Sequence, residues 1–117
     1  MCEIIELINA LKNVKFDFSN EKAVQSKIQK IFDEKQIKYQ REVILDANNI
    51  PDFVVDDIIC VEVKIKGTKK GIYKQLERYS KFEQFTSILL LTNKAVTMPN
   101  QINGKSVIVL NLGLAWL

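Results

Sequence analysis

The segment from Ile50 to Ile65 constrains the fold more than any other part of the sequence, because it places charged residues inside an apolar strand. Side chains alternate between the two faces of a strand. One face of the predicted strand over residues 58–65 is apolar: Ile59, Val61, Val63 and Ile65. The other face carries Cys60, Glu62 and Lys64. Charges in such a strand are costly unless they are paired or bound, so this pattern predicts a polar site on one face of a sheet.

The hairpin turn before this strand decides whether Asp52 meets Glu62. A two-residue turn pairs Asp52 with Val61, and the Asp52 side chain then faces away from Glu62, because a one-residue slip reverses the face. A three-residue turn or a bulge pairs Asp52 with Cys60 or with Glu62 instead. We therefore predict an odd-length turn or a bulge, since only then do the two carboxylates and Lys64 converge.

The remaining periodicity predicts one α/β domain over residues 1–117. Helices are expected at residues 3–12, about 20–35 (capped by Ser19 or Asn20) and about 72–84. Strands are expected at residues 39–45, 53–55, 58–65, 87–92 and 106–110, with a basic loop at 67–71 and a second loop at 99–105. The predicted order is α-α-β-β-β-α-β-β, without a repeat or an interdomain linker.

The composition excludes whole classes of chemistry, because the 117 residues include no histidine. Ser-His-Asp and Cys-His nucleophiles and histidine zinc sites are therefore ruled out. The two cysteines, Cys2 and Cys60, form no metal motif and are interpreted as reduced thiols. The longest apolar run, residues 88–91, is far too short for a membrane helix. We expect a soluble, cytoplasmic protein with no membrane partner.

Asp52, Glu62 and Lys64, if they converge, form a hard-oxygen cation site with an amine beside it. Mg²⁺ and Mn²⁺ prefer carboxylates, carbonyls, water and phosphate as ligands. Such an ion lowers the pKa of a bound water and neutralises charge on a phosphoryl group. The lysine can orient the attacking water or stabilise the transition state as a point charge. The set predicts phosphoryl chemistry that needs no histidine.

The motif Pro51-Asp52, followed by Glu62-Val63-Lys64, resembles the signature of the PD-(D/E)XK nuclease superfamily. The similarity covers roughly residues 20–92. It implies an α/β fold of the restriction-endonuclease-like type: an α-β-β-β-α-β core with a mixed central sheet flanked by helices. The N-terminal helix lies outside the similarity, and the last strand is a common extension.

Two further elements resemble the superfamily. Glu21 matches the metal-site glutamate that many members carry on the first core helix. Residues 75–79 resemble the Q-x-x-x-Y element of the RecB-like and lambda-exonuclease-like branches, with Gln75 and Tyr79 one helical turn apart. We expect Tyr79 to face the core with its hydroxyl near the site. Glu42 is a further candidate near the substrate.

The resemblance assigns roles to these residues. It implies that Asp52 and Glu62 hold Mg²⁺ or Mn²⁺, helped by Glu21 and by the backbone carbonyl of Val63. It further implies that Lys64 positions the attacking water. Gln75 is expected to support Lys64 or a phosphate. The implied product carries a 5′-phosphate.

Basic residues are concentrated directly after the motif. Residues 64–81 hold seven Lys or Arg and one acid, a balance of +6, which leaves −3 for the rest of a chain whose net charge is +3. Such a segment favours salt-dependent, largely sequence-independent binding to phosphates. The expected nucleic-acid-binding residues are Lys66, Lys69, Lys70, Lys74, Arg78 and Tyr79.

These observations predict a Mg²⁺-dependent nuclease that hydrolyses DNA with structure selectivity or weak sequence specificity. RNA is a less favoured substrate. The chain is similar in size to small Holliday-junction-resolvase-like and VRR-NUC-like nucleases, which suggests a homodimer. Residues 4–11 and 112–117, including Trp116, offer either an interface or ordinary core packing. Two alternatives stay open: a non-catalytic nucleic-acid- or protein-binding module on a nuclease-like fold, and an RNA-cleaving toxin-type nuclease.

Overall fold

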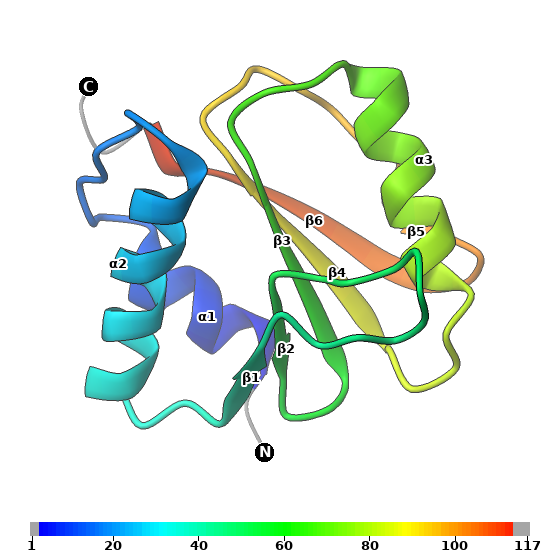
Figure 1. Ribbon diagram of the computed structural model, residues 1–117, viewed down its shortest axis with the longest axis horizontal. Coiled ribbons are helices and arrows are strands. Elements are labelled where there is room, and N and C mark those ends of the chain that lie inside the picture. The colour runs from blue at the N-terminus through cyan, green and yellow to red at the C-terminus, as the bar shows by residue number, and fades with distance from the viewer. Residues whose placement is uncertain (1–2, 114–117) are drawn as a thin grey trace.

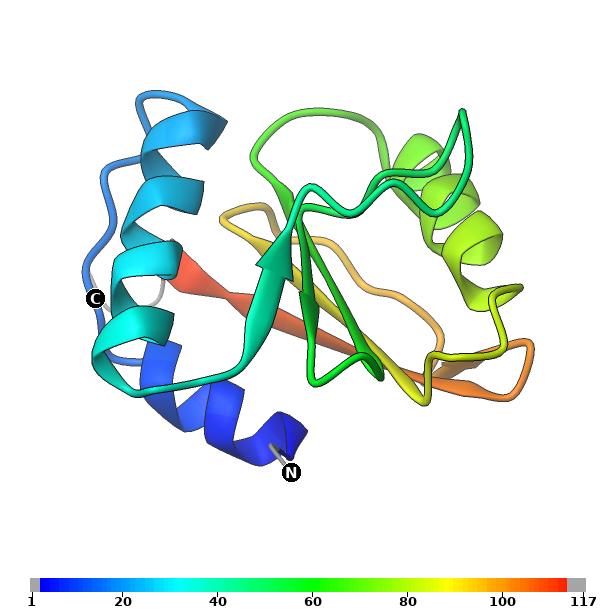
Figure 2. The ribbon, with the colours of Figure 1, turned by 60° about the horizontal axis from the view of Figure 1, so that its bottom comes forward.

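Two helices cover one face of a central sheet and a third helix covers the other, as Figures 1 and 2 show. The computed structural model describes residues 3–113. Over these residues the protein is an α/β domain with a mixed six-stranded sheet and three helices. None of these helices has the length and apolar character needed to cross a membrane.

Side chains cap the starts of two of the three helices. They are α1 (Ile4–Leu11), α2 (Glu21–Glu34) and α3 (Lys69–Ser80). The Asn20 side chain accepts a hydrogen bond from the Ala23 amide at 2.8 Å, as predicted for the second helix. Thr68 caps α3 in the same way by accepting from the Gly71 amide at 3.0 Å. The predicted loop at 67–71 and the predicted helix at 72–84 are therefore wrong at their boundaries, since this cap starts α3 three residues earlier and the helix ends at residue 80.

The strands are β1 (Tyr39–Arg41), β2 (Phe53–Val55), β3 (Ile59–Lys64), β4 (Ser87–Thr92), β5 (Gln101–Ile102) and β6 (Lys105–Asn111). The predicted strand at 39–45 ends early because Glu42 has a positive φ of 52°, which breaks the extended backbone. The predicted loop at 99–105 contains β5. Asn103 and Gly104, both with positive φ, form the two-residue turn that joins it to β6.

The sheet has the order β1-β2-β3-β4-β6-β5. Strands β1, β2 and β3 pair antiparallel, whereas β3, β4 and β6 are parallel. Helix α3 connects the parallel strands β3 and β4, so the carboxyl ends of both strands lie at one edge, where Lys64 pairs with Thr92. Sites in parallel sheets form at such edges.

The turn between β2 and β3 has three residues, because Val55 pairs with Ile59. Asp56 and Asp57 adopt positive φ angles of 52° and 64°. The predicted odd-length turn is confirmed. It places Asp52, just before β2, next to Glu62.

Each face of the sheet has its own hydrophobic core. The face toward α1 and α2 includes Ile59, Val61 and Val63, as predicted, together with Leu7 and Leu11 of α1. The apolar side chains of residues 4–11 that were predicted to form either an interface or the core therefore include core residues. Trp116 lies outside the described residues. The face toward α3 includes Cys60, a buried free thiol. Cys2 also lies outside the described residues.

Candidate active site

Glu62 lies on the α3 side of the sheet with only 3% of its surface exposed. Three donors hold its carboxylate. Gln75 Nε2 donates to Oε2 at 2.8 Å, and the Tyr79 hydroxyl and the Asp52 amide each donate to Oε1 at 3.2 Å. Gln75 also donates to the Tyr79 hydroxyl at 2.9 Å. Two residues one turn apart on α3 thus fix the carboxylate, and Gln75 supports Glu62 rather than Lys64.

Asp52 is half-buried next to Glu62. Its Oδ2 accepts a hydrogen bond from the Val63 amide at 2.8 Å, and its Oδ1 accepts one from Gln25 Nε2 at 3.1 Å. The two residues are therefore joined in both directions: the Asp52 carboxylate accepts from the Val63 amide of β3, and the Glu62 carboxylate accepts from the Asp52 amide just before β2. The odd-length turn makes this reciprocal arrangement possible.

Lys64 places an amine beside the carboxylate pair. Its Nζ lies 3.6 Å from Glu62 Oε2, and 26% of its side chain is exposed, against 4% for Glu62. The amine thus lies between the buried carboxylate and solvent. The predicted convergence of Asp52, Glu62 and Lys64 is confirmed.

Burial and mutual repulsion disfavour two negative charges in this site. Burial, followed by the neighbouring Asp52 carboxylate, raises the pKa of Glu62 to about 8. Burial also raises the pKa of Asp52, and the hydrogen bond from the Val63 amide lowers it in part. Burial and the charge of Glu62 raise the pKa of Tyr79, so its hydroxyl stays protonated and donates. A pair of carboxylates with raised pKa values is a site that a cation would stabilise in its ionised form.

Glu21, the first residue of α2, is close enough to Asp52 for its charge to act on that carboxylate. Its Oε1 accepts a hydrogen bond from the Ile65 amide at 2.9 Å, just beyond β3. Its charge contributes to the raised pKa of Asp52. Within residues 3–113, however, no three Asp, Glu, Cys or His side chains come close enough together to hold a metal ion. Glu21 thus accepts a hydrogen bond from the backbone just after β3. The oxygen donors that fit a hard cation are those of Asp52, Glu62 and the Val63 carbonyl.

Gln25 and Arg41 belong to the site, although the sequence reasoning missed both. Arg41 Nη2 donates to Gln25 Oε1 at 3.0 Å, and Nη1 donates to Gln29 Oε1 at 2.7 Å. Because arginine only donates, Gln25 must turn its oxygen toward Arg41 and its NH₂ group toward Asp52. Gln25 is only 4% exposed. Its position one helical turn after Glu21 is the signal that would have found it.

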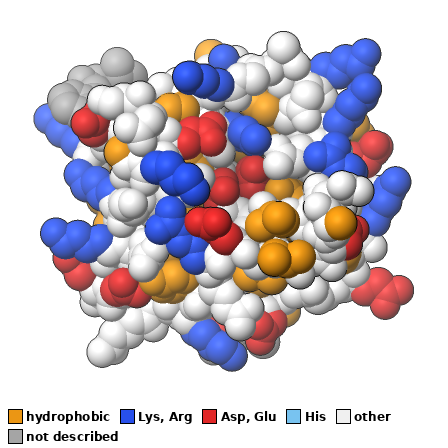
Figure 3. All heavy atoms as spheres, in the orientation of Figure 1, with side chains coloured by type: hydrophobic (Ala, Val, Ile, Leu, Met, Phe, Trp, Pro, Cys, Tyr) orange, Lys and Arg blue, Asp and Glu red, His pale blue; other side chains and the backbone are white. Residues whose placement is uncertain are grey.

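The predicted basic residues lie on the surface, directly after β3 and along α3. Lys66, Lys69, Lys70, Lys74 and Arg78 are all exposed. Figure 3 shows Lys and Arg side chains around acidic side chains near the middle of one face. Tyr79 does not join this surface, because its ring is 1% exposed in the core under α3. Its expected contact with nucleic acid is therefore replaced by its hydrogen bond to Glu62. Glu42 lies at the rim, exposed, with Lys22 at 3.6 Å.

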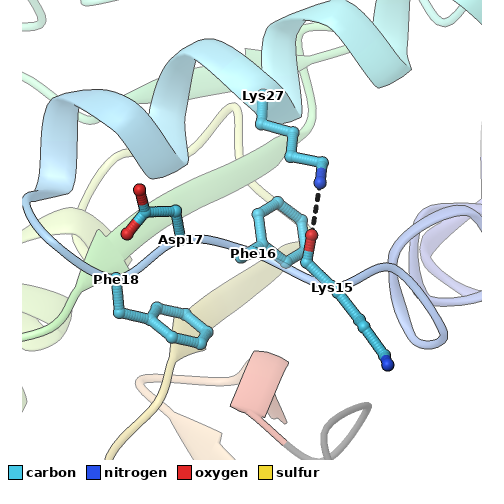
Figure 4. A pocket seen from close by; sticks show the side chains of 5 residues that line it. All are labelled: Lys15, Phe16, Asp17, Phe18 and Lys27. Atoms are coloured by element: carbon cyan, nitrogen blue, oxygen red, sulfur yellow. Dashed lines mark hydrogen bonds between the residues drawn. The ribbon is translucent and has the colours of Figure 1, made fainter.

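A second hollow, of about 640 Å³, lies between α2 and residues 15–18 (Figure 4). Two lysines line it, and the amine of one, Lys27, donates to the Lys15 carbonyl and lies 5.5 Å from the centre of the Phe16 ring. The Asp17 carboxylate accepts from Ser19. The one carboxylate that lines this hollow is Asp17, so the hollow lacks the carboxylate pair that distinguishes the site at Asp52 and Glu62.

Comparisons of the chain with protein-family models, with curated proteins and with solved structures found no match. The site itself combines a buried and a half-buried carboxylate with a partly exposed amine, and exposed basic residues follow it in the sequence. Such a combination can hold a hard cation, orient a water and bind a phosphate.

Proposed function

We propose that this protein is a Mg²⁺-dependent nuclease that hydrolyses phosphodiester bonds in DNA. The observation that carries the proposal is the linked pair of half-buried Asp52 and buried Glu62, with the Lys64 amine 3.6 Å from Glu62. Burying ionisable groups lowers the stability of a fold, and a non-catalytic module would have no catalytic use for them. The exposed lysines around the pair supply the charge that a phosphate backbone requires.

Asp52, Glu62 and the Val63 carbonyl would hold Mg²⁺ or Mn²⁺. When bound, the ion supplies a lowered water pKa and neutralises charge on the phosphate. Lys64 donates hydrogen bonds to the attacking water or to a phosphate oxygen. Gln75, Tyr79 and the Asp52 amide keep Glu62 from rotating. Both oxygens of each carboxylate accept hydrogen bonds, so both side chains are oriented before substrate arrives.

The fold supports the same proposal. From α2 to β4 the elements follow the order α-β-β-β-α-β, and the sheet is mixed. This order is the one that the resemblance to the PD-(D/E)XK superfamily implies. We include a restriction-endonuclease-like topology and a homodimeric state in the proposal.

A cleavage assay tests the proposal. Labelled four-way junction, flap, single-stranded and duplex DNA, and single-stranded RNA, are incubated with the protein in Mg²⁺, in Mn²⁺ and in EDTA. We expect cleavage of at least one DNA with either metal, none in EDTA, and a loss of about 10²–10³-fold in Lys64→Ala. Lys30→Ala, an exposed lysine on α2, is the matched control and keeps its activity.

Other outcomes separate the alternatives. Binding of DNA without cleavage of any substrate would favour the non-catalytic module. Cleavage of RNA alone would favour the toxin-type nuclease. Cleavage that persists in EDTA and in Lys64→Ala would refute the mechanism.

A further inference from the structure

The connection between β1 and β2 exposes apolar side chains beside the site. Within residues 3–113 the exposed large hydrophobic side chains are Ile5, Ile44 and Ile50, at 52%, 73% and 44% exposure. Two of the three therefore belong to this one connection. Figure 3 shows hydrophobic side chains gathered next to the acidic centre of the face, and Figure 2 shows the connection extending from the sheet toward α3. Clustered exposed apolar groups indicate a contact surface.

The connection is held in place by hydrogen bonds. The Leu45 amide donates to the Asn49 carbonyl at 3.0 Å, and Asn49 Nδ2 donates to the Asp46 carboxylate at 2.9 and 3.1 Å. Arg78 Nε of α3 donates to Asn49 Oδ1 at 3.2 Å. Val43 and Leu45 pack on the core under α3. Ile44 and Ile50, at 73% and 44% exposure, thus project from a support that hydrogen bonds hold in place.

The same connection is joined to the catalytic residues. The Glu42 amide donates to the Asp52 carbonyl at 2.9 Å, and Ile50 precedes Asp52 by two residues. A nucleic acid whose phosphate reaches Asp52 therefore passes this surface. Lys74 and Arg78, exposed on the neighbouring helix α3, offer charge for its flanking phosphates. The nearby acids are engaged: Asp46 by its own turn, and Glu42 by Lys22.

In a continuous duplex isoleucine can reach only groove features such as thymine methyl groups, or must unstack a base step at a cost of about a few kcal/mol. An interrupted stack already exposes the apolar face of a base pair. An isoleucine can therefore pack on that face without the cost of unstacking. A second copy of the chain is a poorer occupant, because two isoleucines offer far less than the ~800 Å² per partner that a stable interface buries.

We infer that Ile44 and Ile50 form an apolar wedge that packs on the open face of a base pair, so that the substrate is DNA with an interrupted stack. Junctions, flaps and duplex ends have this feature. The inference rests on the proposed nuclease function and names its substrate class. The wedge places the interruption next to Asp52 and hence next to the bond that is cut.

The experiment compares a flap DNA with a continuous duplex of the same sequence. The flap carries 2-aminopurine at the base next to the branch. Cleavage rates in Mg²⁺ give the flap-to-duplex ratio, and fluorescence in Ca²⁺ reports contact with the branch base. The double variant Ile44→Ser/Ile50→Ser is compared with wild type, and Ile5→Ser on α1 is the control of similar exposure. Thermal denaturation verifies that each variant is folded.

Wild type is expected to prefer the flap and to change the 2-aminopurine fluorescence on binding. The double variant lowers the flap-to-duplex ratio about tenfold and loses the fluorescence change, whereas Ile5→Ser retains both. If wild type cleaves DNA and the double variant has the same flap-to-duplex cleavage ratio, the wedge is refuted and the proposed nuclease function stands. A dimer in sedimentation that becomes a monomer in the double variant also overturns it. Absence of any nucleic-acid cleavage or binding by wild type overturns the proposed function and the wedge together.

Discussion

Raising the pH in EDTA tests the electrostatics of the site, because it ionises a buried carboxyl group. The pKa of Glu62 is raised from 4.5 to about 8, mainly by burial and then by Asp52. Between these values the folded protein keeps a proton that the unfolded chain has lost. The stabilising effect is therefore complete below pH 4.5 and is lost as the pH rises to about 8. The raised pKa of Asp52 acts in the same direction.

The magnitude follows from the difference between the two pKa values of Glu62. One proton held across each pH unit is worth about 1.4 kcal/mol. Because the carboxyl group is half-titrated in the unfolded chain at pH 4.5 and in the folded protein at pH 8, the metal-free protein loses roughly 4 kcal/mol of unfolding free energy between these two pH values. A domain of this size has a total of about 5–15 kcal/mol. The loss should therefore be visible without any ligand.

Urea denaturation at pH 5, 7 and 9 in EDTA measures this effect. In Glu62→Gln the slope with pH should largely vanish, although the absolute stability falls because the new amide faces donors. Glu34→Gln, an exposed carboxylate on α2, serves as the control and keeps the wild-type slope. Mg²⁺ should reduce the loss at pH 9, since it favours the ionised pair. Equal slopes in wild type and Glu62→Gln would refute the reasoning.

Three further results are expected. Gln25→Leu should destabilise the fold by about 1–3 kcal/mol, because Arg41 Nη2 loses its acceptor, and should lower cleavage, because Asp52 loses a donor. Gln29→Ala should keep cleavage; denaturation and rate assays measure both effects. Lys70→Ala should weaken the binding of duplexes of different sequence equally, because Lys70 is expected to contact phosphate. It should also reduce the slope of the logarithm of the binding constant against the logarithm of the salt concentration by about 1, measured by fluorescence titration. Glu21→Gln should lower the cleavage rate less than Asp52→Asn does, because a glutamine oxygen still accepts from the Ile65 amide; equal losses would make Glu21 a metal ligand.

Strand alternation accounts for the part of the site that the sequence predicted. Glu62 and Lys64 had to share a face, and the requirement that Asp52 join them predicted the odd-length turn that the structure shows. The Gln75–Tyr79 spacing likewise predicted a shared helix face with the Tyr79 hydroxyl near the site, whereas the bond from Gln75 to Glu62 was not predicted, since Gln75 was expected to support Lys64 or a phosphate. These features depend on contacts between near neighbours or on simple periodicity.

The remaining features depend on packing between distant elements. The chain of bonds from Arg41 through Gln25 to Asp52 forms because α2 lies across the β1 end of the sheet, and no local pattern encodes that approach. The start of α3 depends on Thr68, which sequence reasoning placed in a loop. The connection that carries Ile44 is irregular and is held by Asn49 and α3, so its exposure is visible only in the structure.

Calorimetric titration of the metal-free protein with Mn²⁺ at pH 7 tests the central claim most directly, because the claim is that Asp52 and Glu62 together bind a divalent cation. We predict one ion per chain in wild type, with release of about one proton, since Glu62 must ionise as the ion binds. Proton release is measured by repeating the titration in buffers of different ionisation enthalpy. Asp52→Asn should lose this binding. Absence of binding in wild type, or equal binding in Asp52→Asn, would contradict the account.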